Sequence, residues 1–166
     1  MTKNKTEIKA EPGKQELTIT REFNASREIV FRAFTEPELV AQWLGPRILV
    51  TKIEAYDAKT TGNYRFTQFA PDGARHVFNG VFHLVVQPEF IIRTFEYEGL
   101  PERGHVSLET VRLKAIAEQR TLAVTHCVFQ TIADRDGIIA AGMERGVLES
   151  YDRLDDLFIS GKGIKP

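Results

Sequence analysis

His126 and Glu109 are the residues of this sequence best suited to acid–base chemistry. His126 shares its alternating position with Leu122 and Val124 in a predicted strand, so we expect its ring to face inward. Glu109 and Ser107 hold inward positions on the preceding strand, where either would lie opposite His126. A neighbouring carboxylate tunes an imidazole for general acid–base catalysis near neutral pH. Two alternatives remain. His126 could make a structural hydrogen bond without any role in catalysis, or the face assignment of the strand could be wrong by one residue, so that His126 points outward.

The other residues capable of polar chemistry predict neither a metal site nor a cofactor. His76 and His83 point to opposite faces of one predicted strand, and no two histidines stand two to four residues apart. Cys127 is the only cysteine, which excludes an internal disulfide, and we expect it to be a small buried thiol facing away from His126. The sequence also lacks a glycine-rich phosphate loop and a nucleophile elbow.

Aromatic residues favour a different chemistry, the binding of an apolar molecule. The chain has 11 phenylalanines in 166 residues, and their flat surfaces suit an apolar or aromatic ligand. Each could instead be an ordinary core residue, since every domain buries such side chains. In this hypothesis His126 is the polar anchor of the ligand. The residues expected to line the pocket are Trp43, Tyr64, Phe66, Phe78, Phe82, Phe95, His126, Phe129, Met143, Val147 and Tyr151.

Alternating apolar and polar residues predict seven strands, and their short, turn-rich connections indicate an antiparallel meander. Two short helices follow the first strand, the second opening on a capping box at Thr35–Glu38 and ending at Gly45. The strands are expected at residues 15–23, 48–56, 64–69, 75–86, 90–97, 106–116 and 121–131.

Helical periodicity after Gly137 predicts one long final helix that extends through Phe158. Gly142 and Gly146 fall inside it, and each costs about 1 kcal/mol relative to alanine. Such a cost calls for close packing against a sheet or for open space beside a cavity. The whole pattern predicts an α+β domain in which a curved sheet wraps the final helix and leaves a cavity between them.

Composition and charge exclude some classes of function. The formal net charge is −1, with acidic and basic residues mixed along the chain, which argues against nucleic acid as a partner. No apolar stretch approaches the ~18 residues that span a bilayer, and the first 16 residues show no hydrophobic signal run. We therefore expect a cytoplasmic protein with a flexible arm over residues 1–14, one domain over 15–161 and a frayed tail over 162–166.

Two segments resemble the family of homologues of the activator of heat-shock-protein-ninety ATPase. The first runs from Asn24 to Leu39 and continues through Gln42-Trp43-Leu44-Gly45-Pro46; the second covers residues 142–154. That family is part of the START-like (SRPBCC, polyketide cyclase) superfamily. The resemblance implies a helix-grip fold, like that of the birch-pollen allergen, and a hydrophobic pocket. Leu44 and Val147 stand where the family often has tryptophan, so we expect a larger or reshaped pocket and transfer no relative's ligand.

Three hypotheses follow for the function. The first is a protein that binds a small hydrophobic molecule without covalent chemistry. The second is an enzyme of cyclase, aldolase or hydrolase type, with His126 as acid or base and Glu109 beside it. The third is an interaction protein acting on a chaperone, which the absence of room for a second domain disfavours. Relatives of this kind often form dimers, but no residue of the sequence identifies an interface.

Overall fold

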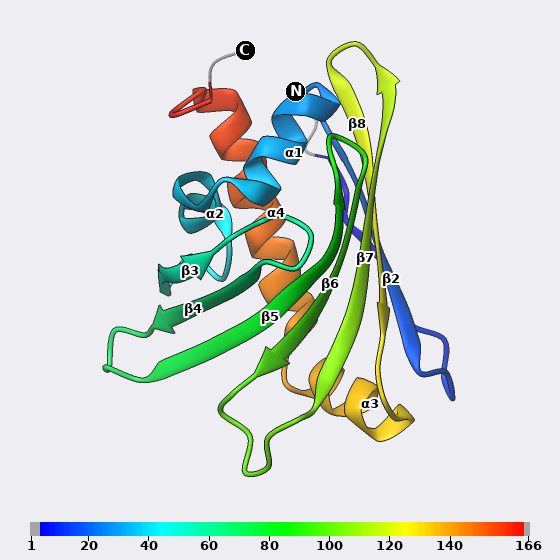
Figure 1. Cartoon of the computed structure of the whole chain (residues 1–166), viewed down its shortest axis with the longest axis vertical. Coiled ribbons are helices and arrows are strands. Elements are labelled where there is room, and N and C mark those ends of the chain that lie inside the picture. Colours follow the sequence, from blue (N-terminus) through cyan, green and yellow to red (C-terminus); the bar gives the residue numbers. More distant parts are fainter. Residues whose placement is uncertain (1–3, 165–166) are drawn as a thin grey trace.

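The computed structural model describes residues 4–164 as one antiparallel eight-stranded sheet with four helices (Figure 1). The strand order is β1-β2-β8-β7-β6-β5-β4-β3. Every connection joins neighbouring strands except the one from β2 to β3, which crosses to the other edge of the sheet. The strands are β1 (Glu7–Lys9), β2 (Glu16–Phe23), β3 (Val50–Tyr56), β4 (Asn63–Phe69), β5 (Arg75–Val86), β6 (Phe90–Tyr97), β7 (Val106–Ala117) and β8 (Arg120–Val128).

The N-terminal arm contains a strand that the sequence pattern did not predict. Residues 7–9 pair with residues 18–20 of β2, so the sheet has eight strands rather than seven. Thr6 is buried, and its hydroxyl accepts a hydrogen bond of 2.7 Å from Arg21. A run of three residues is too short to show alternation, and a tertiary contact orders it. Residues 1–3 of the predicted arm lie outside the described part of the chain.

The four helices occupy the concave side and the ends of the sheet (Figure 1). Helix α1 (Arg27–Thr35) begins at Ser26, whose hydroxyl accepts from the Ile29 amide, and α2 (Pro37–Trp43) starts on proline. In place of one long final helix there are two, α3 (Ile132–Ala140) and α4 (Met143–Ser160). Gly142 separates them with a φ of 89°, a left-handed conformation that an apolar periodicity cannot reveal.

Helix α4 crosses the concave face, with α1 and α2 near one of its ends and α3 at the other (Figure 1). Tyr151 on α4 packs edge-on against Phe23 at a centroid distance of 5.3 Å, inside a continuous hydrophobic core. Ile164 is buried in that core, although the sequence predicted a frayed tail from residue 162. None of the helices among residues 4–164 is both long and apolar enough to cross a membrane.

Candidate functional site

An apolar pocket of about 480 Å³ lies between α3, the end of β7 and the connection from β6 to β7. Its surface is mostly carbon, while several polar side chains stand among the apolar ones. The lining residues are Phe95, Tyr97, Leu100, Pro101, Glu102, His105, Val106, Ser107, Phe129, Ala133, Asp134, Gly137, Ile138 and Ala141.

Two local patterns build this pocket. On α3 and its C-cap residue, the lining residues at 133, 134, 137, 138 and 141 recur at helical spacing, so they form one stripe facing the sheet. On the sheet, Phe95 of β6 pairs directly with Ser107 of β7, and both side chains belong to the concave face. The pocket is therefore a gap between a helix face and the strand ends beside it.

A second, enclosed cavity of about 30 Å³ lies deeper, and Phe95 borders both spaces. Its lining consists of Val40, Trp43, Leu44, Tyr56, Tyr64, Phe66, Arg93 and Phe95. Arg93 is the single charged group in this aromatic wall. A cavity of this size holds about one water molecule.

Arg93 forms a buried ion pair with Glu109 at the centre of the concave face. Its Nε donates to Glu109 Oε2 at 2.9 Å, and its Nη1 donates to the Tyr56 hydroxyl at 3.3 Å. The guanidinium also lies 5.6 Å from the centre of the Tyr64 ring. Burial alone would lower the pKa of Arg93, but the charge of Glu109 raises it above the ordinary value. Arg93 is therefore charged at neutral pH.

The tyrosines around this ion pair are neutral donors. Burial raises the pKa of Tyr56 and Tyr64, and it raises the pKa of Tyr151 to about 12. The Tyr56 hydroxyl donates to the Phe34 carbonyl at 2.9 Å, and the Tyr64 hydroxyl donates to the Thr94 carbonyl. Both hydroxyl protons are thus committed to backbone acceptors.

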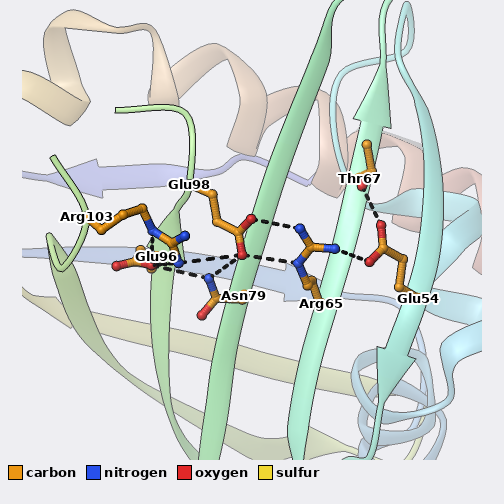
Figure 2. Close-up of polar contacts among 7 residues, drawn as sticks. All are labelled: Glu54, Arg65, Thr67, Asn79, Glu96, Glu98 and Arg103. Atoms are coloured by element: carbon orange, nitrogen blue, oxygen red, sulfur yellow. Dashed lines mark hydrogen bonds and ion pairs between the residues drawn. The ribbon is translucent and has the colours of Figure 1, made fainter. Parts of the chain in front are cut away.

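A polar network on the convex face fixes the loop that forms one wall of the larger pocket (Figure 2). Arg103, within this β6–β7 loop, donates to Glu96 at 2.6 and 3.0 Å, and the Gly104 amide donates to the same carboxylate at 2.7 Å. Asn79 links Glu96 to Glu98 at 3.3 and 2.9 Å. Leu100 and its neighbours are therefore held against the pocket by contacts on the opposite side of the sheet.

The same network continues across two further strands. Arg65 of β4 binds Glu98 at 2.9 and 3.1 Å and also contacts Glu54 of β3, which accepts from Thr67 (Figure 2). These contacts raise the pKa of Arg65 and lower the pKa values of Glu54 and Glu98. The loop is thus tied, through one chain of charges, to the edge of the sheet.

Replacing Arg103 by glutamine is expected to free the loop. Hydrogen bonds from Arg103 lower the pKa of Glu96, so the ionised contact stabilises the fold above the unfolded carboxyl pKa of about 4.3 and is lost as the pH falls through the lower folded value. At pH 7 the backbone order parameters of residues 99–104, measured by ¹⁵N relaxation, should fall from about 0.85 to below 0.6. The difference between the variant and the wild type should shrink as the pH falls through the lowered pKa of Glu96.

Arg120→Gln is the matched control, because Arg120 pairs with Glu22 away from this loop. It should leave residues 99–104 as ordered as in the wild type. Unchanged order parameters in Arg103→Gln at pH 7 would show that the loop is fixed by its own packing instead.

The structure separates the predicted pocket residues into three groups. Four of them border the enclosed cavity, namely Trp43, Tyr64, Phe66 and Phe95. Phe129 lines the larger pocket, together with Phe95. The others belong to the packed core or lie against it, and border neither space; these are Phe78, Phe82, Met143, Val147 and Tyr151.

The orientation predicted for His126 is wrong. Its ring lies on the convex face, 43% exposed, with Nε2 2.9 Å from a carboxylate oxygen of Glu16. The inward residues of β8 are Thr121, Ala123, Thr125 and Cys127, so the faces are displaced by one residue. Small side chains face inward here, while the larger Leu122 and Val124 face outward, which reverses the usual hydrophobic pattern. Cys127 accordingly points into the core, where burial raises the pKa of its thiol.

Glu109 does face inward, but it lies beside Cys127 of β8 and pairs with Arg93 rather than with His126. Arg93 was missed as a site residue. It lies on the same face of the strand as Ile91 and Phe95, two residues away on either side. An arginine that shares the face of apolar neighbours is the signal that identifies an inward charge. The pocket residues of α3 were missed because that helix was joined to α4 in the prediction.

Metal-ligating side chains do not gather in this region. Among residues 4–164, no three or more histidine, cysteine, aspartate or glutamate side chains lie together in a way that could hold a metal ion. His105 Nδ1 lies 2.9 Å from Asp134 Oδ1, and both residues line the larger pocket. This pair supplies a hydrogen-bonding group at the pocket wall.

Comparison with protein families gives a match over residues 24–158 to the family described as Activator of Hsp90 ATPase homolog 1-like protein. The chain belongs to this family. The match includes both helices after β2, every strand from β3 to β8, and nearly all of α4. It therefore contains both cavities and the Arg93–Glu109 pair. No protein of curated function matches the sequence at a significant level.

Solved structures of other proteins share the fold. A protein from Rhodobacter sphaeroides is 25% identical with a TM-score of 0.80, and the alignment covers 93% of this chain and 99% of that one. A Mycobacterium smegmatis protein is 17% identical with a TM-score of 0.83, covering 93% and 98%. The AHSA1 protein from Silicibacter pomeroyi is 20% identical with a TM-score of 0.72, covering 87% and 97%. These likenesses confirm the predicted helix-grip, START-like fold.

Proposed function

We propose that this family member binds a small apolar or aromatic molecule in the pocket between α3 and the sheet. The observation that carries the proposal is the pocket itself, about 480 Å³ in volume and lined chiefly by aromatic and aliphatic side chains. Ligand sites for small molecules have volumes of about 300–1,000 Å³ and a few polar groups among apolar walls. The polar groups here include His105, Ser107 and Asp134.

Thermal unfolding against a library of small aromatic compounds tests this function. A ligand at one hundred times its dissociation constant adds about 2.7 kcal/mol of stability. For a domain of this length, that gain should raise the midpoint by about 5–10 °C. A rise confined to one chemical class would support the proposal and identify the ligand chemistry. No rise with any compound would contradict it and favour a protein partner.

A second candidate function is hydrolysis of a bound ester, and one observation favours it. His105 and Asp134 form a pair at 2.9 Å, and Ser107 lines the same pocket. The Ser107 hydroxyl donates to the Phe95 carbonyl at 3.5 Å rather than to the imidazole, so a substrate would have to turn it. Release of naphthol from naphthyl acetate, lost in both Ser107→Ala and His105→Ala, would support this candidate. Equal rates in all three proteins would exclude it.

A further inference from the structure

We propose that the ligand of the pocket carries a neutral hydrogen-bond acceptor, such as a ketone or ester carbonyl, which binds Arg93. This inference rests on the proposed function, since it assigns the chemistry of the ligand held in the same pocket. The acceptor end of the ligand passes Phe95 and occupies the enclosed cavity. The apolar body stays between α3 and the sheet.

The register of β6 and β7 places Arg93 directly behind the pocket. Phe95 pairs with Ser107 in the wall of the pocket, and the next inward pair along the same two strands is Arg93 with Glu109. Two residues along a strand span about 7 Å. Phe95 borders the pocket and the enclosed cavity alike, so a ligand that reaches from one space into the other must displace this ring.

Arg93 offers donors to this space. A guanidinium has five N–H groups; Nε binds Glu109 and Nη1 binds Tyr56, whereas within residues 4–164 no acceptor is seen for Nη2. The side chain keeps 16% exposure although aromatic residues surround it, because it borders the cavity. The hydroxyl protons of Tyr56 and Tyr64 are already committed to carbonyls. Arg93 is therefore the available donor at the inner end.

The charge balance selects a neutral acceptor over an anion. Glu109 already neutralises Arg93 at 2.9 Å, so a ligand carboxylate would be repelled by one partner while attracted by the other. A pure hydrocarbon would displace water from the guanidinium without replacing its hydrogen bond, which is costly in a buried site. A carbonyl oxygen replaces that bond and adds no charge.

Three naphthalenes with one ring system and different substituents test the inference. They are 2-ethylnaphthalene, 2-acetylnaphthalene and 2-naphthoate, and their dissociation constants are measured by titration calorimetry. In the wild type the ketone should bind about tenfold more tightly than either of the others. The ethyl compound gains no hydrogen bond from Arg93, and the carboxylate of naphthoate is repelled by Glu109. The ethyl compound measures the contribution of the pocket walls alone.

The double variant Arg93→Met/Glu109→Met should lose this preference and bind 2-ethylnaphthalene at least as tightly as the wild type does, because no guanidinium is left to be stripped of its hydrogen bond. Both residues are replaced because removing Arg93 alone leaves a buried, unpaired carboxylate, whereas apolar replacement of a whole pair is often tolerated. Arg112→Met is the control, since Arg112 lies on the exposed face of β7 over the Phe90 ring. It should retain the tenfold preference for the ketone.

The outcomes distinguish this inference from the proposed function. If the three compounds bind the wild type equally, if naphthoate binds most tightly, or if the double variant keeps the ketone preference, the role of Arg93 is wrong while the pocket still binds aromatics. If none of the three binds, both the ligand chemistry and the pocket function are overturned. A ketone preference present in the wild type and Arg112→Met but absent in the double variant supports the inference.

Discussion

Replacing Gly137 by leucine should close the pocket and stabilise the protein at the same time. Gly137 lies in the middle of the α3 stripe, and a Cβ added there meets no atom within 4 Å. Leucine is a stronger helix former than glycine, by about 0.5–1 kcal/mol. Its side chain takes the space of the ligand. Fitting both into the pocket should cost about 1–3 kcal/mol of binding free energy, so we expect affinity for an aromatic ligand to fall by about five- to 150-fold.

Titration calorimetry and thermal unfolding of the same samples measure both effects. Gly146→Leu is the matched control, because Gly146 lies in α4, has the same open surroundings and does not line the pocket. It should gain the helical stabilisation and bind ligand as the wild type does. Full affinity in Gly137→Leu would show that ligands bind elsewhere in the molecule.

Replacing Arg21 by methionine should destabilise the fold by about 3–5 kcal/mol. Arg21 is 1% exposed, faces inward from β2, and pairs with Asp155 and Asp152 of α4, the latter at 3.1 Å. It also donates to Thr6, which carries the N-terminal strand. Removing the arginine leaves the buried carboxylate of Asp155 without its counter-charge, and it removes the ion pairs that join α4 to the sheet.

Urea unfolding followed by circular dichroism measures this loss. Arg47→Met provides the comparison, because Arg47 pairs with Asp156 on the same helix but both side chains are about half exposed. An exposed pair contributes about 0–1 kcal/mol, so this control should barely change stability. A loss below about 1 kcal/mol in Arg21→Met would mean that apolar packing alone holds α4 in place.

Local chemistry made most of the fold predictable from the sequence. Turn residues such as Gly62 and Gly73 marked the hairpins, and Pro37 marked the start of α2, because their backbone preferences act within a few residues. The strand at residues 7–9 was not predictable in this way. It depends on pairing with β2 and on the contact between Thr6 and Arg21, neither of which leaves a local pattern.

The candidate site was less predictable, because it depends on which face of each strand turns inward. In β8 the small Ala123 and Cys127 face the core, so hydrophobicity pointed His126 the wrong way. The break at Gly142 turns α3 towards the strand ends and creates the larger pocket there, yet periodicity alone joined the two helices. Trp43, Tyr64, Phe66 and Phe95 do border one cavity together, and they come from elements whose ends were well marked.

The most direct test of the pocket function is a titration of the ¹⁵N-labelled protein with 2-acetylnaphthalene, followed by amide chemical shifts. We expect the largest saturable shifts at residues of the pocket wall, including Val106, Gly137 and Ile138. Residues of the convex face, such as Val124, should not move. Shifts centred on the convex face, or no saturable shifts at all, would contradict the assignment of this pocket as the binding site.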